Sequence, residues 1–240
     1  MTKYHDVRNQ LLDRLDQMSA GDPFPPERDL AQELGVSRMT LRRAIDELVA
    51  RGAVRRRHGA GVFALGPKLD QPLLASSFSE DMRARGLRPG ARTLAFEVLP
   101  AGARFGRRLN IDPSAEITRV TRLRLADDEP IAVEELNVPR HLMPDLHAAD
   151  LEDRSFYDLL RERLGISVRR SVQTIEPTVL DSDEAKDLNV PLHSPALMFE
   201  RTSWGPEGQP IEFVRSLYRG DRYKIRTELS VPANTVEEIS

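Results

Sequence analysis

A pair of adjacent prolines, Pro25 and Pro26, with Gly35 and Gly52 at short distances behind it, most constrains how this chain can fold. Proline cannot sit inside a helix but suits its first turn, so the pair predicts a helix over 27–34. Gly35 can supply the positive φ angle of a tight turn between two helices. Because Gly52 ends the helical pattern that follows, this segment predicts a helix, a turn and a second helix.

The second helix of this pair has one apolar face and one basic face. Ser37 can cap its first turn with the hydroxyl group. The apolar face holds Leu41, Ala44, Ile45 and Leu48, and the opposite face holds Arg38, Arg42 and Arg43. A helix about 10–12 Å in diameter matches the roughly 12 Å width of the DNA major groove. The sequence therefore predicts a basic helix, held by a small core, that inserts into that groove.

Segments on both sides complete a small domain. Apolar residues at steps of three or four predict a helix over 4–18. Residues 53–65 place apolar side chains around a basic, glycine-bearing tip at 55–61, which predicts a two-stranded hairpin, or wing. Each feature alone is most often a solvated surface, and an arginine run especially so. Their joint occurrence favours a winged helix-turn-helix that binds DNA.

Composition divides the chain into two parts. Of its 240 residues, 1–66 carry eleven Lys and Arg against nine Asp and Glu, whereas the remainder carries 24 against 29. We expect a DNA-binding domain at 1–66, a proline-bearing linker at 67–74 and a larger domain at 75–236. The absence of cysteine excludes disulfides and cysteine metal sites, and no apolar run approaches the roughly 18 residues of a membrane span. We therefore expect a cytoplasmic protein without a membrane anchor.

The larger domain shows an α+β pattern. Alternating residues predict strands at 94–98, 117–125, 131–138, 168–179, 197–204, 211–218 and 223–229. Helices are predicted at 79–85, 101–109, 155–164 and 182–188. An internal repeat is also visible, because one set of residues recurs 79 to 80 positions later: Leu109-Asn110-Ile111, Arg122 and Pro130-Ile131, then Leu188-Asn189-Val190, Arg201 and Pro210-Ile211. Two similar helix-plus-hairpin units are expected to form one sheet and to frame a cleft.

Polar side chains gather on predicted strand faces. Side chains alternate along a strand, so Arg122 and Arg124 share one face, as do Glu212, Ser216 and Tyr218 on another strand. Paired arginines suit a phosphate or carboxylate, and nearby carboxylates suit amino or hydroxyl groups. The alternative is that the two arginines are surface cross-strand partners of the glutamates at 134 and 135.

Several segments of the amino-terminal part form a recognisable pattern: Phe24–Ala31, Leu34–Ala44 and Arg56–Phe63, with Leu48 and Gly52. In these segments the chain resembles the GntR family of bacterial transcription regulators. This resemblance implies that Arg38 reads base edges, that Arg28, Arg42 and Thr40 hold phosphates, and that a wing-tip pair enters the minor groove. With two neighbours in the same turn, the predicted DNA-binding residues are Arg28, Ser37, Arg38, Met39, Thr40, Arg42, His58 and Gly59.

The larger domain contains a second set of recognisable segments: Ser77–Met82 with Gly86, Arg122–Arg124, Glu129–Glu134, Ser155–Tyr157 and Pro210–Tyr223. Through these segments, residues 77–229 resemble the UTRA effector-binding domain of HutC-type GntR regulators, an antiparallel-sheet domain similar in fold to chorismate lyase. Among these regulators, the branch controlling N-acetylglucosamine use implies a phosphate site of Ser77, Phe78, Arg122, Arg124, Ser155 and Tyr157. It implies a sugar site of Glu134, Glu212 and Tyr218. One departure is Leu-Asn in place of Leu-Gly after the helices at 101–109 and 182–188.

The leading interpretation is a homodimeric transcription regulator, a repressor, that binds a palindromic operator and responds to a small anionic metabolite. Glucosamine-6-phosphate or N-acetylglucosamine-6-phosphate is the first expectation, with other sugar phosphates and urocanate-like acids as alternatives. Ligand binding is expected to reorient the DNA-binding domains through the linker. A chorismate-lyase-like enzyme and a DNA-binding scaffold with a degenerate pocket are the other functions considered. No catalytic residue, metal site or cofactor is predicted, because the five histidines show no metal spacing and no nucleophile motif is present.

Overall fold

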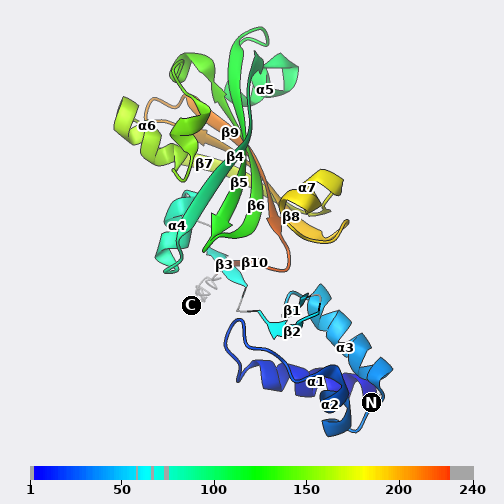
Figure 1. Cartoon of the computed structure of the whole chain (residues 1–240). Helices are drawn as coiled ribbons and strands as arrows, with labels where there is room; N and C mark the ends of the chain where they lie inside the picture. Colours follow the sequence, from blue (N-terminus) through cyan, green and yellow to red (C-terminus); the bar gives the residue numbers. More distant parts are fainter. Residues whose placement is uncertain (1–2, 58, 66–67, 73–75, 228–240) are drawn as a thin grey trace, which may run out of the picture.

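The structure, a computed structural model, describes residues 3–57, 59–65, 68–72 and 76–227. The chain forms a small amino-terminal domain and a larger carboxy-terminal domain built on a sheet, each with its own hydrophobic core (Figure 1). No helix in the described ranges is both long and apolar enough to cross a membrane.

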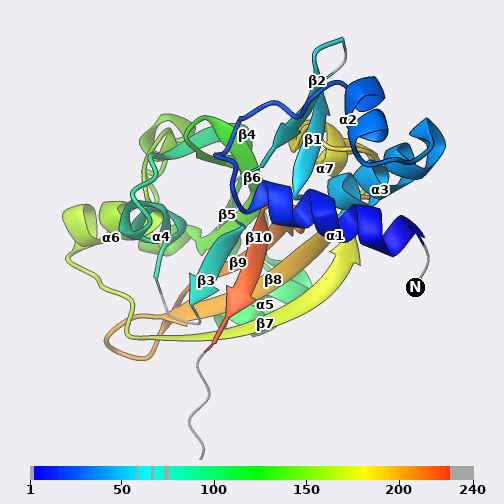
Figure 2. The same cartoon turned by 90° about the horizontal axis from the view of Figure 1, so that it is seen from below.

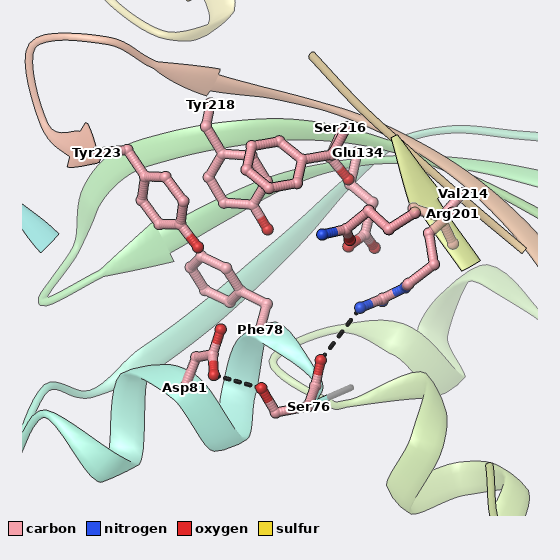
Figure 3. Close-up of a pocket in the computed structure, with 11 residues that line it drawn as sticks. Ser76, Phe78, Asp81, Glu134, Arg201, Val214, Ser216, Tyr218 and Tyr223 are labelled. Atoms are coloured by element: carbon pink, nitrogen blue, oxygen red, sulfur yellow. Dashed lines mark hydrogen bonds between the residues drawn. The ribbon is translucent and has the colours of Figure 1, made fainter. Parts of the chain in front are cut away.

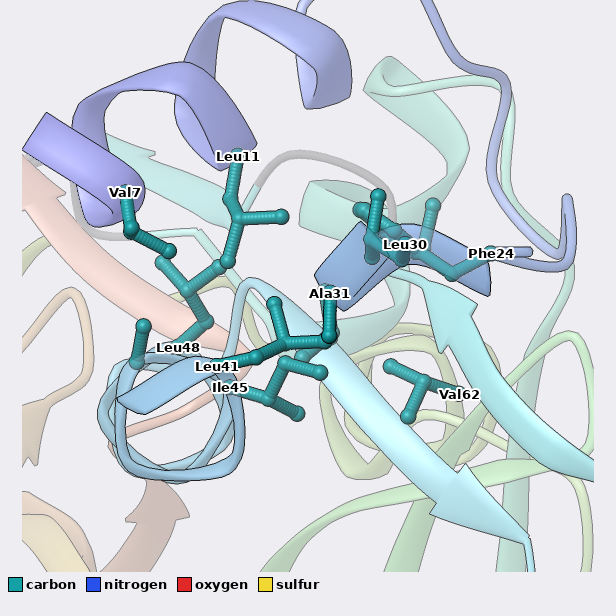
Figure 4. Packing of buried hydrophobic residues seen from close by; sticks show 12 residues of the cluster. Val7, Leu11, Phe24, Leu30, Ala31, Leu41, Ile45, Leu48 and Val62 are labelled. Carbon is teal, nitrogen blue, oxygen red and sulfur yellow. The ribbon is translucent and has the colours of Figure 1, made fainter. Parts of the chain in front are cut away.

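The amino-terminal domain is a three-helix unit with a hairpin. Its elements are α1 (Lys3–Leu15), α2 (Glu27–Glu33), α3 (Arg38–Ala50), β1 (Val54–Arg57) and β2 (Gly61–Ala64). Val7 and Leu11 of α1, Leu30 of α2 and the apolar face of α3 meet in one core, against which Val62 of the hairpin packs (Figure 4). The predicted helix-turn-helix and wing are confirmed, although α1 ends at Leu15, before the expected Met18.

Local chemistry starts the helix predicted to enter DNA. Ser37 is the N-cap of α3, and its Oγ accepts a hydrogen bond from the Thr40 backbone N–H at 3.1 Å. Gly35, at φ 61°, makes the turn between α2 and α3 as predicted. Phe24 N–H donates to the Val62 carbonyl at 2.8 Å, so the chain entering α2 is joined to the wing. The turn and the wing are therefore both fixed relative to α3.

The carboxy-terminal domain is built on a six-stranded antiparallel sheet in the order β4-β5-β6-β9-β8-β7. Its strands are β4 (Pro89–Pro100), β5 (Glu116–Ala126), β6 (Glu129–Pro139), β7 (Arg170–Val179), β8 (Pro195–Trp204) and β9 (Pro210–Arg219). Its helices are α4 (Phe78–Ala84), α5 (Gly102–Leu109), α6 (Phe156–Leu164) and α7 (Ser182–Asp187), with 3-10 turns at Arg140–Leu142 and Ala148–Leu151. The expected α+β antiparallel architecture is confirmed.

The sheet order shows that the predicted internal repeat is a structural one. Each unit runs strand, helix, hairpin, and the last strands of the two units, β6 and β9, pair at the centre of the sheet. Asn110 and Asn189 follow α5 and α7 with left-handed φ angles of 51° and 53°. Asparagine tolerates this conformation better than most residues, so it replaces glycine at both helix ends. Strands β5 and β8 therefore occupy corresponding positions.

Helices cover the two faces of the sheet. In Figure 1, α4 and α6 lie on one side and α5 and α7 on the other. Phe105 of α5 packs with Phe213 of β9, and Leu188, just after α7, packs with Leu217 of β9. On the opposite face, Phe156 of α6 belongs to the core around Val214. That second face is the one on which the polar side chains gather.

Part of the segment expected to be a linker is regular structure. Leu69–Pro72 forms β3, which pairs in parallel with β10 (Tyr223–Arg226) in a separate two-stranded sheet. The prediction placed β10 among the strands of the larger domain, and alternation along one strand gave no indication of its partner. Figure 2, the view from below, shows the two strands side by side in front of the main sheet. The chain leaving the wing is thus anchored on the carboxy-terminal domain.

Candidate functional site

A row of side chains crosses one face of the sheet at its centre. Arg122 of β5 is paired with Glu134 of β6, Glu134 with Ser216 of β9, and Ser216 with Phe199 of β8. Paired residues in neighbouring strands project to the same face, so these four side chains line one surface. The predicted face-sharing of Arg122 with Arg124, and of Glu212 with Ser216 and Tyr218, follows from the same register.

Arg122 and Glu134 form a buried ion pair. The Arg122 guanidinium donates from Nη2 to the Glu134 carboxylate, and from Nη1 to the carbonyl of Arg154 at 3.2 Å. Burial alone would raise the pKa of Glu134, but Arg122 and Arg124 outweigh it and hold that pKa below its usual value. The Arg122–Glu134 pair is therefore the cross-strand contact that was the alternative interpretation, made in the interior instead of at the surface.

Arg124 is buried, and no carboxylate among the described residues forms an ion pair with it. Its guanidinium lies over the Phe78 ring at 4.6 Å, and Nη2 donates to Ser79 Oγ at 3.1 Å. Within the described part of the chain, Nε and Nη1 have no hydrogen-bond partner. Burial, with the neighbouring charge of Arg122, lowers the pKa of Arg124 to about 10. Such an arginine can receive an anion without losing an existing partner.

Glu212 has a different environment from Glu134. Its Oε1 accepts hydrogen bonds from the Tyr157 hydroxyl at 2.6 Å and from Ser203 Oγ at 2.9 Å, and Arg201 Nε lies 3.8 Å away. Burial raises the pKa of Glu212 although Arg201 opposes this shift. The two buried glutamates thus have pKa values pushed in opposite directions.

The helix starts beside these residues are capped by their own serines. Ser77 and Glu80 form a capping box at α4. Ser155 caps α6, where its Oγ accepts from the backbone N–H of Tyr157 at 3.2 Å. The Tyr157 hydroxyl is engaged by Glu212, so these expected phosphate contacts are occupied by internal bonds in this structure. An anion here would have to compete with them.

The nine predicted effector residues lie together in two adjoining pockets. The first holds eight of them, lined by Ser77, Phe78, Arg122, Arg124, Glu134, Ser155, Tyr157 and Glu212. Tyr218 lines the second, which shares Phe78, Glu134, Arg201 and Val214 with the first (Figure 3). Each pocket offers about 20 Å³, space for roughly one water molecule. Lining side chains must therefore move to admit a metabolite.

Arg201 is a pocket residue that the list of predicted site residues omitted. It lines both pockets, and its Nη1 donates to the Ser76 carbonyl at 3.1 Å (Figure 3). The guanidinium lies 5.5 Å from the centre of the Tyr157 ring. The internal repeat contained the signal, because Arg201 is the counterpart of Arg122 in the second unit.

Five of the eight predicted DNA-binding residues lie on α3 or at its N-cap. Arg38, Met39 and Arg42 are exposed, with Met39 74% exposed despite its apolar side chain. Ser37 and Thr40 share a hydrogen bond between their hydroxyl groups at 2.9 Å. Glu27 of α2 lies 3.7 Å from Arg42 Nε, so α2 helps to orient that arginine. These residues form one exposed, basic helix end.

The remaining predicted DNA contacts lie outside α3. Arg28 on α2 is exposed, with its Nε donating to Asp29 at 2.9 Å. Gly59, at the wing tip, is exposed and has a φ angle of 71°. His58 lies outside the described residues.

A winged helix-turn-helix joined to a sheet domain with a charged internal pocket defines a ligand-responsive DNA-binding regulator. The family comparisons agree with this class. Residues 3–64 match the model of bacterial regulatory proteins of the gntR family, and residues 84–224 match the UTRA domain. The chain belongs to the GntR family, in its HutC-type branch with a UTRA domain, and is a transcription regulator, not an enzyme.

Relatives resemble the chain over nearly its whole length. The HTH-type transcriptional repressor NagR of Bacillus subtilis is 33% identical over 92% of this chain and 91% of its own. The repressor PhnF of Mycolicibacterium smegmatis is 36% identical over 92% and 89%. The crystal structure of PhnF from Mycobacterium smegmatis superposes with a TM-score of 0.67 at 34% identity, covering 93% of this chain and 99% of that one. The chorismate-lyase-like enzyme considered from sequence is therefore rejected.

Proposed function

We propose that this protein is a cytoplasmic, homodimeric transcriptional repressor whose affinity for its operator changes when an amino-sugar phosphate binds the pocket of the sheet domain. Several relatives are named as repressors, including NagR, PhnF and the Escherichia coli mannosyl-D-glycerate system repressor MngR. These names concern different systems, so the ligand is inferred from the pocket's own chemistry.

The buried guanidinium of Arg124 is the observation that carries the anion assignment. Leaving a charged group in the interior without a charged partner is costly, and arginine recognises phosphate with two parallel hydrogen bonds. Arg122 and Arg201, like Arg124, have an Nε without a hydrogen-bond partner among the described residues. Three arginines face two glutamates, one of which has a raised pKa, so the pocket favours an added negative charge.

The rest of the pocket suits the amino and hydroxyl groups of a sugar. Glu134 holds a carboxylate at the junction of the two pockets. Ser216 and Tyr218 add hydroxyl groups on the same strand face. Carboxylates and hydroxyls of this kind recognise amino and hydroxyl groups by hydrogen bonding. Glucosamine-6-phosphate and N-acetylglucosamine-6-phosphate combine both features and are the first candidates.

A thermal-shift series tests this assignment. Glucosamine-6-phosphate and N-acetylglucosamine-6-phosphate should raise the melting temperature of the protein, because a ligand that binds only the native state stabilises it. Glucosamine without phosphate and inorganic phosphate alone should each give a smaller shift. Urocanate serves as the carboxylate comparison. If urocanate shifts the melting temperature and neither sugar phosphate does, the amino-sugar assignment is wrong.

On the DNA side, we propose that Arg38 reads guanine in the major groove while Arg28, Arg42 and Thr40 contact phosphates. Met39 supplies an exposed apolar group suited to a thymine methyl. A homodimer matches a palindromic operator because its two-fold symmetry repeats the contact at each half-site. Sedimentation of the protein with and without a palindromic duplex tests the stoichiometry, with two chains per duplex expected.

A further inference from the structure

The turn between β9 and β10 begins and ends at aromatic residues of the pocket. Tyr218 near the end of β9 and Tyr223 at the start of β10 both line the second pocket (Figure 3). Their rings stack with centroids 4.2 Å apart and an interplanar angle of 28°. The turn they enclose is Arg219–Arg222. A ligand that displaces either ring therefore acts directly on this turn.

Hydrogen bonds hold the turn in one conformation. Arg219 donates to both carboxylate oxygens of Asp221, at 3.0 and 2.8 Å, and to the Pro130 carbonyl at 2.9 Å. Gly220 N–H donates to the Pro195 carbonyl at 3.0 Å. Lys68, between the wing and β3, donates to the Gly220 carbonyl at 2.5 Å. The turn is thus a braced element that can transmit a displacement.

The same turn abuts the DNA-binding domain at Gly52. Gly52 is buried, has a φ angle of 67°, and separates α3 from the wing. A Cβ built on Gly52 would lie 2.5 Å from the Cα and 2.6 Å from the Cβ of Asp221, and nearer still to its carbonyl oxygen. At Gly35, also left-handed in this domain, a Cβ would meet no described atom within 4 Å. The absence of a side chain at Gly52 is what allows the two domains to approach so closely.

We propose that the Arg219–Arg222 turn couples the effector pocket to the DNA-binding domain through the contact between Asp221 and Gly52. The pocket beside Tyr218 and Tyr223 has room for about one water molecule, so a metabolite must displace lining side chains to enter. Displacement of these rings shifts Asp221. Because Gly52 is in close contact with Asp221, the DNA-binding domain must shift as well. Because Gly52 joins the helix and the wing, both DNA-contacting parts change orientation together.

This coupling rests on the proposed ligand-responsive function and adds the path by which the signal passes from the pocket to the DNA-binding domain. The sequence led us to expect that the signal passes through the proline-bearing linker. A ligand changes operator affinity only as far as it binds the docked and undocked arrangements unequally. Weakening the contact should therefore leave ligand binding intact and reduce the effect of ligand on operator affinity.

The test compares Gly52→Ala with Gly35→Ala. Both substitutions place alanine at a left-handed φ angle in the same domain, so both carry similar backbone strain. Only the methyl group at Gly52 meets the turn. With glucosamine-6-phosphate as the probe, the ratio of operator Kd values with and without ligand should fall to within about twofold of one in Gly52→Ala. Gly35→Ala should keep the wild-type ratio, whatever its absolute affinity.

A second arm needs no ligand. Because the chain has no cysteine, spin labels can be placed at Gln32→Cys on α2 and Lys186→Cys on α7 without background labelling. Spin-diluted distance measurements should show one defined interdomain distance in the wild type and in Gly35→Ala, and a shifted or broadened distribution in Gly52→Ala. An unchanged distribution in Gly52→Ala overturns the docking contact, even if no sugar phosphate binds and the ligand assignment fails.

A further variant acts from the other side of the contact. Arg219→Met removes the bonds that brace Asp221 without changing the DNA-binding domain. It should lower the ratio of operator Kd values with and without ligand. The rise in melting temperature caused by glucosamine-6-phosphate should stay close to that of the wild type. Wild-type ratios in both Gly52→Ala and Arg219→Met, with ligand binding retained, would overturn the coupling. If the wild type does not bind glucosamine-6-phosphate, that result would instead contradict the proposed ligand.

Discussion

Arg122 on β5 lies directly opposite Glu134 on β6, and its guanidinium donates to the Glu134 carboxylate where the residues are only 3% and 6% exposed. The second buried glutamate of the pocket, Glu212, accepts its hydrogen bonds from the neutral hydroxyl groups of Tyr157 and Ser203. One carboxylate is therefore held ionised, while burial favours the protonated form of the other. This difference gives the two glutamates opposite effects on stability as pH changes.

The first prediction concerns Glu134. Its pKa is lower in the folded protein than the ordinary value of 4.5, so between those values the unfolded chain binds more protons. Its contribution to stability is present above pH 4.5 and is lost as pH falls through the lowered pKa. Denaturant unfolding at a series of pH values should show a weaker acid loss in Glu134→Gln than in the wild type. An identical acid dependence would show that this carboxylate is not the group responsible.

Glu212 should behave in the opposite sense. Its pKa is raised above 4.5 on folding, so the native protein binds more protons than the unfolded chain in the range just above that value. Stability falls as pH rises from 4.5 through the raised pKa. Glu212→Gln keeps an uncharged group there and should lose this decline, measured by the same unfolding series. A decline as steep as that of the wild type would contradict the assignment.

We predict that Arg124 is needed for ligand binding and does not stabilise the folded protein. Arg124→Met keeps a long side chain over Phe78 but removes a buried charge that has no ion-pair partner in the described ranges of the chain. The free energy of unfolding without ligand should be unchanged or higher by up to ~2 kcal/mol, since replacing buried charges by apolar groups is often stabilising. The melting shift with glucosamine-6-phosphate should disappear.

A matched change separates this effect from general damage to the sheet domain. Arg88→Ala alters an exposed arginine of the same domain, which pairs with Asp128 outside the pocket. It should leave the ligand-induced shift intact. A strongly destabilised Arg124→Met protein, or one that keeps the full shift, would show that Arg124 serves the fold and not the ligand.

Substitution of Arg38 and substitution of Arg42 should change DNA binding in different ways. Arg38→Ala should weaken operator binding by roughly 1–3 kcal/mol and relax sequence preference, because it removes a contact to base edges. Arg42→Ala should weaken binding to operator and random duplexes alike and reduce the salt dependence, because it removes a phosphate contact. Fluorescence anisotropy at several salt concentrations measures both, with Arg88→Ala as the control. Unchanged affinity and preference in Arg38→Ala would exclude its place in the groove.

The parts of the fold that the sequence predicted are those set by interactions between neighbouring residues. Proline at a helix start, glycine or asparagine at a helix end and the Ser37 cap each act within a few residues, so the boundaries of α2 and α3 followed from the sequence. Alternation along a strand has a period of two, so it also predicted that Arg122 and Arg124 share a face. The internal repeat predicted one sheet from two units, and the topology confirms it.

Contacts between distant segments were decided by the tertiary structure. No local pattern shows that β3 pairs with β10, because both strands are short and they lie more than a hundred residues apart in the sequence. Burial of the Arg122–Glu134 pair depends on α4 and α6 covering that face of the sheet, which strand alternation cannot report. The repeat in the sequence marks Arg201 as the counterpart of Arg122, but that both arginines line one pocket depends on the pairing order of the strands.

The contact between Gly52 and Asp221 shows the same division. The sequence by itself determined that Gly52 ends a helix, because a left-handed φ angle at that position favours glycine. That Gly52 also faces Asp221, far along the chain, depends on how the two domains pack, and only the tertiary structure decided it. Backbone conformation is encoded by neighbouring residues, whereas a contact between domains depends on the shapes of two completed surfaces.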